Sequence, residues 1–281
     1  MARRGGTLAL PYAIGLVLLV GLPMIAAIAL AFTEFTGIQA PRFTGLDNFS
    51  RLVGDDAFWR SLGNSLIYIL IAVPLRLVAA VGFALLLHRR ARGIGAARAA
   101  VYLPSVVPDV AYALLWLWLL NPLYGPLALA LGSYSPDFLS EPWGARVGIA
   151  LMGAFQVGEA FVIALAARRM IPAPLYEAAA VDGATPWFTL RSVTLPLMAP
   201  IMALLALRDV ILSLQVNFVP ALIITDGGPR YATTYLPLYV YRTAFRYFRF
   251  GYASALTLSM FVLTAVAIYM QYRLARRYRL I

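Results

Sequence analysis

The sequence has no cysteine and no lysine among its 281 residues. The absence of cysteine excludes disulfide bonds and thiolate chemistry in this chain. The absence of lysine excludes a P-loop, because that motif uses a lysine to reach the nucleotide phosphates. The one histidine, His88, lies in a basic stretch, and no HExxH motif, GxSxG motif or plausible set of zinc ligands occurs. The sequence therefore predicts that this chain is not an enzyme.

Hydrophobic residues are abundant: they make up 62% of the chain, and the mean hydropathy is +0.80. That share is well above the apolar content of soluble domains, so the solvent is lipid. Apolar runs of about 20 residues mark spanning helices. Six are predicted within one all-α polytopic membrane domain covering residues 1–281: 9–32, 62–87, 101–121, 145–167, 195–217 and 252–272. The first resembles a signal peptide, but its long apolar run and lack of a cleavage site indicate a retained helix.

The net charge is +11, and its distribution indicates topology. Four groups of arginines occupy alternate segments between the predicted spans, which places them on one face: Arg3 and Arg4; Arg89, Arg90, Arg92 and Arg98; Arg168, Arg169 and Arg191; Arg273, Arg276, Arg277 and Arg279. Basic loops stay cytoplasmic. We therefore expect a multi-pass protein of a bacterial or archaeal plasma (inner) membrane, with both termini cytoplasmic. The arginines serve topology and lipid contact, not nucleic-acid binding.

A polar segment, Ile171–Pro200, interrupts the apolar runs and has strong local signals. Pro174 suits the first turn of a helix that continues to Val181. Gly183 ends that helix, because glycine readily adopts the left-handed conformation. Thr185, followed by a proline, is a typical N-cap of a second helix. The segment is predicted to be a structured cytoplasmic loop between two spans.

This loop resembles the EAA loop of bacterial ATP-binding-cassette importer permeases. Glu177-Ala178-Ala179 precedes Gly183 by three residues, and nine further residues lead to Val193-Thr194-Leu195-Pro196, with valine where isoleucine is usual. Other stretches resemble the carbohydrate-uptake branch, the maltose- and glycerol-phosphate-type permeases: Leu103-Pro104 through Trp116, Asn121-Pro122, Thr225 to Pro229, and Phe250 to Ala253. The resemblance covers nearly the whole chain.

The resemblance implies a type I importer permease fold in which the EAA loop forms a coupling helix that docks into a cytoplasmic ATPase. The residues carried over to that contact are Glu177, Ala178, Ala179, Asp182, Gly183, Leu195 and Pro196. Implied partners are a second, homologous permease, two ATP-binding-cassette ATPase subunits and an extracytoplasmic solute-binding protein. ATP and Mg would bind the ATPase, with no cofactor in this chain. The first outside loop lacks the large insert of some maltose permeases, which weakens maltose as the substrate.

Five charged residues fall within the predicted spans: Arg76, Asp109, Glu159, Arg208 and Asp209. A charge at the bilayer centre costs about 2.5–3.5 kcal/mol, so each needs a partner or a cavity. Adjacent helical residues diverge by about 100°, so Arg208 and Asp209 are expected to have partners on other helices. One interpretation is structural pairing, such as Arg76 with Asp109 or Glu159. The other is a polar lining for a sugar path, for which the candidates are Asp109, Trp116, Glu159, Gln215 and Asn217.

The leading hypothesis is therefore the transmembrane subunit of an ATP-driven, binding-protein-dependent importer of a sugar or oligosaccharide. An importer of another solute, such as a phosphorylated polyol or a polyamine, is an alternative. A secondary transporter or channel subunit is a second alternative, although the paired broken helices typical of ion-coupled carriers are not evident in the sequence. A membrane enzyme is disfavoured by the lack of a reactive group of residues.

Overall fold

The structure is a computed structural model that describes residues 10–89, 91–215 and 217–277. Arg3, Arg4, Arg90 and Arg279, which contribute to the predicted charge asymmetry, lie outside the described residues. The chain divides into two compact units. Unit 1 comprises Met1–Trp59 and Tyr239–Leu263, and unit 2 comprises Arg60–Leu238 and Thr264–Ile281.

Four helical stretches in the described chain are long and apolar enough to cross a membrane: Leu10–Leu30, Asp56–Leu86, Pro186–Gln215 and Phe250–Arg277. Two bent pairs bring the number to six if each pair is one span. The first span contains the π-helical turn η1 (Val17–Gly21) and helix α2 (Leu22–Leu30). The others are α4 (Asp56–Leu86), α11 (Pro186–Thr189) with η4 (Leu190–Thr194) and α12 (Leu195–Gln215), and α15 (Phe250–Arg277). The expected all-α polytopic architecture is confirmed.

Two of the predicted spans, 101–121 and 145–167, each contain a bend. Helix α5 (Ile94–Tyr102) and the 3-10 turn η2 (Leu103–Ser105) meet α6 (Asp109–Leu119) at 99°. Pro104 and Pro108 flank this break; proline lacks an N–H donor and disfavours helical backbone before it. Helix α8 (Pro142–Phe155) meets α9 (Gly158–Met170) at 51°. Two of the spans are therefore broken, which the sequence did not reveal.

Unit 1 is organised around short polar contacts. Strand β1 (Thr33–Glu34) pairs antiparallel with β2 (Arg42–Phe43), Thr33 opposite Phe43. Asn48 of α3 (Asp47–Val53) donates to the carbonyl oxygens of Ala31 and Thr33, both at 2.9 Å. These bonds hold the hairpin against α3.

Asp55 also belongs to unit 1, where its carboxylate accepts hydrogen bonds from Tyr239 and Tyr252, each at 2.5 Å. Tyr239 lies in α14 (Leu236–Tyr241), which the π-helical turn η6 (Arg242–Arg246) follows. Burial alone would raise the pKa of Asp55, but these two bonds and those from the backbone N–H groups of Ala57 and Phe58 lower it below its ordinary value. Burial, followed by the bond to Asp55, raises the pKa of Tyr239. The Asp55 carboxylate therefore holds the hydroxyl groups of two tyrosine side chains in place.

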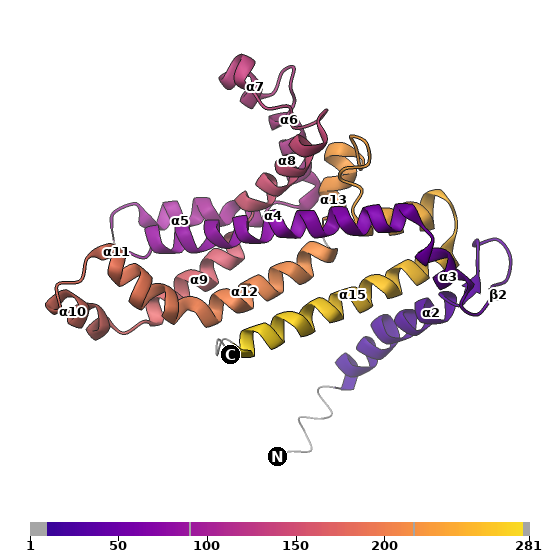
Figure 1. Ribbon diagram of the computed structural model, residues 1–281, viewed down its shortest axis with the longest axis horizontal. Coiled ribbons are helices and arrows are strands. Elements are labelled where there is room, and N and C mark those ends of the chain that lie inside the picture. The colour runs from indigo at the N-terminus through magenta and orange to yellow at the C-terminus, as the bar shows by residue number, and fades with distance from the viewer. Residues whose placement is uncertain (1–9, 90, 216, 278–281) are drawn as a thin grey trace. The chain divides into compact units, whose positions relative to one another are not determined.

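Unit 2 has its core between α4, α8, α9 and α12, and α12 packs against α9 (Figure 1). One cluster joins Val81 and Ala84 of α4 to Phe161 of α9 and Met198 of α12. A second buries Trp116 and Tyr112 of α6 with Met152 of α8. The remaining helices of the described chain are α7 (Pro126–Leu131), η3 (Gly132–Tyr134), α10 (Ala173–Val181), α13 (Phe218–Pro220) and η5 (Ala221–Thr225).

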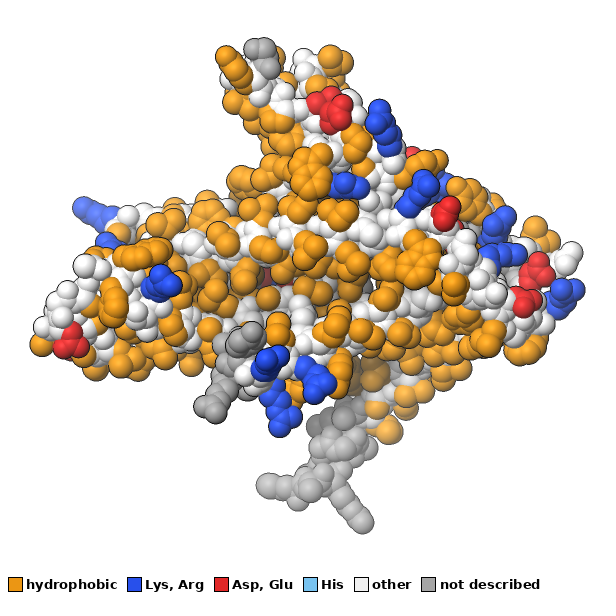
Figure 2. Space-filling model, viewed as in Figure 1, with side chains coloured by type: hydrophobic (Ala, Val, Ile, Leu, Met, Phe, Trp, Pro, Cys, Tyr) orange, Lys and Arg blue, Asp and Glu red, His pale blue; other side chains and the backbone are white. Residues whose placement is uncertain are grey.

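Apolar side chains cover much of the visible surface (Figure 2). In the first span, none of the most apolar window is buried within the chain, and Leu19 is 79% exposed. So much exposed apolar surface is typical of a protein whose spans face lipid or another subunit.

Candidate functional site

The loop between α9 and α12 adopts the local structure that its residues predict. Helix α10 ends at Val181, Asp182 is its C-cap, and Gly183 has a φ of +71°, in the left-handed region that favours glycine. Thr185 is the N-cap of α11, and its hydroxyl accepts a hydrogen bond from the N–H of Phe188 at 3.3 Å. The result is a helix, a tight turn and a second helix that continues into α12.

This loop is strongly exposed and lies at the opposite end of unit 2 from α13 (Figure 1). None of the α10 residues is buried. Among the residues predicted for the ATPase contact, the ones on the surface are Glu177, Ala178, Asp182, Gly183 and Pro196, while Ala179 and Leu195 are partly covered. Large apolar side chains are exposed beside them, including Val181 at 88% and Trp187 at 69%. Exposed apolar and acidic groups on an ordered loop form a surface suited to a protein partner.

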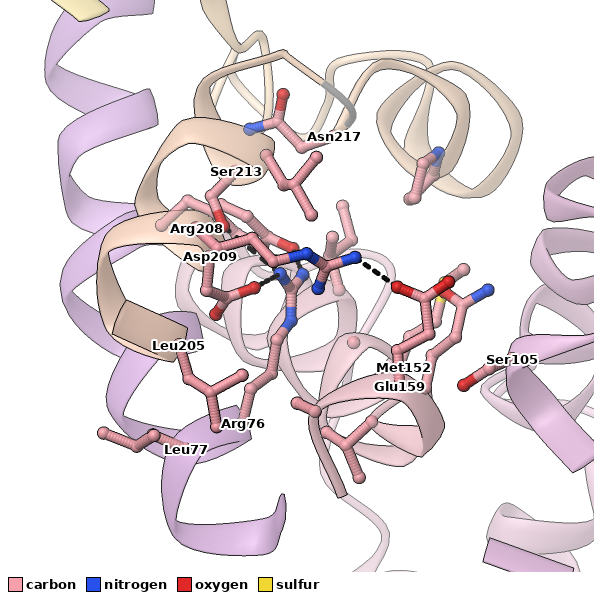
Figure 3. Close-up of a pocket in the computed structure, with 18 of the residues that line it drawn as sticks. Arg76, Leu77, Ser105, Met152, Glu159, Leu205, Arg208, Asp209, Ser213 and Asn217 are labelled. Carbon is pink, nitrogen blue, oxygen red and sulfur yellow. Dashed lines mark hydrogen bonds and ion pairs between the residues drawn. The ribbon is translucent and has the colours of Figure 1, made fainter. Parts of the chain in front are cut away.

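A second feature of unit 2 is a cavity of about 300 Å³ between α4, α8, α9 and α12 (Figure 3). Its lining combines apolar side chains with an unusual number of polar and charged ones. The polar lining residues are Tyr68, Arg76, Ser105, Asp109, Gln156, Glu159, Arg208, Asp209, Ser213 and Asn217.

Arg76 forms the buried ionic centre of this cavity. Its Nη1 donates to Asp209 Oδ1 at 2.9 Å and to Ser213 Oγ at 3.2 Å, and its Nη2 donates to the Tyr68 hydroxyl. The side chains of Arg76 and Asp209 are only 19% and 20% exposed. Gly153 of α8 makes room for the guanidinium, since a Cβ atom there would lie 2.6 Å from Arg76 Nε. The partner of Arg76 is thus Asp209, which corrects the predicted examples of Asp109 and Glu159.

Arg208, the neighbour of Asp209, pairs with Glu159 of α9 (Figure 3). This pair is more open, with side-chain exposures of 44% and 59%. The expectation that Arg208 and Asp209 have partners on different helices is confirmed. Helix α12 is consequently joined to α4 by one ion pair and to α9 by the other.

The breaks in the two bent spans meet at the cavity. Ser105, at the end of η2, accepts a hydrogen bond from the N–H of Gly158, the first residue of α9, at 2.8 Å. Asp109, the first residue of α6, accepts one from Gln156 at 3.3 Å. Non-helical backbone at membrane depth requires protein or water around it, and the cavity meets this requirement.

The residues predicted for a sugar path are only partly brought together. Asp109, Glu159 and Asn217 line the cavity. Trp116 instead packs in the core between Tyr112 and Phe155, with ring centroids 6.2 and 5.5 Å away. Gln215 is exposed and absent from the lining. Sequence reasoning overlooked Tyr68, Ser105, Gln156 and Ser213 as lining residues; the prolines around Ser105 were the available signal for a break there.

Several buried polar atoms at the cavity have no hydrogen-bond partner among the described residues. They are Arg76 Nε, Asp209 Oδ2, and both the Nδ2 and Oδ1 atoms of Asn217, whose residue is 4% exposed. Donors and acceptors are both represented. Such atoms are costly to bury without partners.

Comparison with known proteins identifies the family. Residues 76–280 match the family described as the binding-protein-dependent transport system inner membrane component. The chain belongs to this family. It is a transport subunit rather than an enzyme, and the predicted resemblance to importer permeases is confirmed.

Individual relatives match this chain over nearly its full length. The probable ABC transporter permease protein YesP of Bacillus subtilis (strain 168) is 34% identical over 91% of this chain and 85% of YesP. The trehalose/maltose transport system permease protein MalF of Thermococcus litoralis is 30% identical over 93% of this chain and 90% of its own. A bacterial alginate ABC transporter, solved in complex with an alginate pentasaccharide-bound periplasmic protein, matches with a TM-score of 0.84 and 26% identity, covering 97% of this chain and 93% of the other.

Proposed function

We propose that this chain imports a sugar or oligosaccharide, working with a second permease, two ATPase subunits and an extracytoplasmic solute-binding protein. The relatives support this substrate class through the trehalose/maltose and alginate systems that they belong to. The complex of the alginate transporter with its periplasmic protein supports the binding-protein partner. ATP and Mg would bind the ATPase subunits, and the positive charge of the arginine-rich loops would keep both termini in the cytoplasm.

The observation that carries the coupling function is the exposed helix α10 with its positive-φ turn at Gly183. In this proposal, Glu177 and the small side chains of Ala178 and Ala179 face the ATPase, and small residues permit close backbone approach. Helix α11 leads from this contact into α12, which holds Arg208 and Asp209 at the cavity. ATP-driven closure of the ATPase subunits would move α10, and through α12 this movement would be transmitted to the residues that surround the solute.

The cavity suits a carbohydrate on chemical grounds. A sugar presents hydroxyl groups that both donate and accept, which matches the mixture of donors and acceptors in the lining, including Asp109, Gln156 and Arg208. Tyr68 lines the same cavity and offers an aromatic ring of the kind that packs on sugar C–H groups. Asp109, Glu159 and Asn217 would then belong to the solute path, with Trp116 supporting it from the core.

The test is to co-express the chain with its partner subunits and measure ATP hydrolysis and uptake in proteoliposomes. Maltose, trehalose, lactose and alginate oligosaccharides, each delivered by the cognate binding protein, would serve as probes. Gly183→Val should reduce uptake at least tenfold while membrane insertion persists, whereas Gly183→Asn, which tolerates positive φ, should retain most of it. Glu177→Arg should likewise fail, with Glu141→Arg, an exposed acidic residue outside the loop, as its control.

Unchanged uptake in both Gly183→Val and Glu177→Arg would overturn the coupling function. Stimulation by a polyamine or a phosphorylated polyol, with no response to any sugar, would overturn the substrate class and leave the coupling function in place.

A further inference from the structure

Helix α10 is held by very few side-chain contacts, and these converge on Tyr176. The Arg168 guanidinium carbon of α9 lies 4.4 Å from the centroid of the Tyr176 ring. The Tyr176 hydroxyl shares a hydrogen bond of 3.1 Å with Thr194 Oγ1. In the described part of the chain, no other α10 side chain forms a hydrogen bond or ring contact beyond its own helix, and no α10 residue is buried.

The two contacts of Tyr176 lead to different helices. Arg168 lies in the last turn of α9, whereas Thr194 is the last residue of η4 and directly precedes α12. Thr194 is 3% exposed, so its hydroxyl is fixed within the packed base of α12. One aromatic side chain thus connects the exposed loop helix to both spans that flank it.

We propose that Tyr176 is a positioning residue that orients α10 on α9 and α12, so that displacement of α10 moves α12. This inference rests on the proposed coupling function. Thr194 and Arg208 are 14 residues apart along a continuous helix, about 21 Å at 1.5 Å per residue. Without the bond to Thr194, α10 can tilt while α12 stays in place, and the cavity responds less to ATP.

The absence of cysteine in the chain allows this response to be measured without knowing the solute. Leu212 lines the cavity, so Leu212→Cys provides a single site for a maleimide fluorophore. The assay uses the complete transporter with its ATPase in proteoliposomes. It compares the labelling rate without nucleotide and after trapping with ATP, Mg and vanadate, together with ATP hydrolysis and co-purification of the ATPase.

The measured quantity is the labelling rate of the introduced cysteine in the vanadate-trapped state divided by its rate without nucleotide. On the Leu212→Cys background, Tyr176→Phe and Thr194→Val should each bring this ratio about three- to tenfold closer to one. That factor is the one expected for the loss of a single hydrogen bond. The Thr194 hydroxyl also donates to the Thr189 carbonyl oxygen at 3.4 Å, so Thr194→Val removes two bonds. The double variant should be no worse than Thr194→Val alone, because that substitution has already removed the bond to Tyr176. Thr194→Ser, which keeps the hydroxyl, should restore the ratio. ATPase binding and hydrolysis should persist in every variant, which a general loss of folding would not allow.

Arg168→Gln should weaken the response, while the exposed neighbour Arg169→Gln serves as the matched control. An unchanged ratio in Tyr176→Phe and Thr194→Val, with Glu177→Arg still uncoupled, would overturn this inference alone. If Leu212→Cys without any further substitution is labelled at the same rate in the trapped and nucleotide-free states while ATP hydrolysis is intact, the proposed coupling function is overturned.

Discussion

The two ion pairs of α12 should differ sharply in their effect on stability, because adjacent residues experience different burial. Asp209→Asn removes the charge that faces Arg76 and leaves the guanidinium with neutral partners only, among them Ser213 and the Tyr68 hydroxyl. Glu159→Gln makes the same chemical change in the pair with Arg208. The two substitutions are therefore a matched comparison between a buried and an open pair.

The exposures determine the expected magnitudes. For the pair of Arg76 and Asp209, at 19% and 20% exposure, removal of one partner should cost about 3–5 kcal/mol. For the pair of Arg208 and Glu159, at 44% and 59%, the loss should stay below about 1 kcal/mol. At about 2 °C per kcal/mol for a chain of this size, Asp209→Asn should lower Tm by about 6–10 °C and Glu159→Gln by less than about 2 °C.

Thermal unfolding of the purified protein in detergent micelles would measure this difference through the fluorescence of its five tryptophans. A double variant, Arg76→Met with Asp209→Leu, replaces both buried charges by apolar groups and should recover most of the lost stability. Equal Tm losses in Asp209→Asn and Glu159→Gln would refute the reasoning. So would a double variant that is less stable than Asp209→Asn alone.

Two further predictions concern a charge outside the spans and a close packing contact. Asp55 has a lowered pKa, so its bonds to Tyr239 and Tyr252 stabilise the fold fully above about pH 4 and are lost as pH falls below that value. The Tm difference between the unaltered chain and Asp55→Asn should accordingly be constant near neutral pH and shrink in acid; a difference that grows in acid would contradict this. Gly153→Ala should displace the Arg76 guanidinium and lower stability by about 1–3 kcal/mol, whereas Gly82→Ala, with open space at its Cβ position, should not destabilise the chain in the same unfolding assay.

Local signals were sufficient to predict the loop at 171–200. The N-cap at Thr185 and the positive φ at Gly183 depend on chemistry within three or four residues, so they can be read directly from sequence. The straight spans were predictable for a related reason, because a long apolar run has few alternatives in lipid.

The charge partners were not predictable, since they depend on how distant helices pack. Arg76 and Asp209 are separated by 133 positions, and Arg208 and Glu159 by 49. Helical geometry established that Arg208 and Asp209 point in different directions, but it carries no information about which helices lie there. The same limit applies to Trp116: as an aromatic residue in an apolar run it is a reasonable candidate for the path, but it lies in the core.

The bends escaped prediction because hydropathy measures composition and not backbone continuity. The chain around each break is apolar enough to count as part of a span, yet a polar residue lies at each one: Asp109 directly after Pro108, and Gln156 just before Gly158. Unpaired backbone groups cannot face lipid, so a break at membrane depth must lie against protein or water. A polar side chain beside such a break has the same requirement. A helix break and a polar side chain that occur together in an apolar run therefore indicate where a span lines a cavity. Here both breaks line the same cavity.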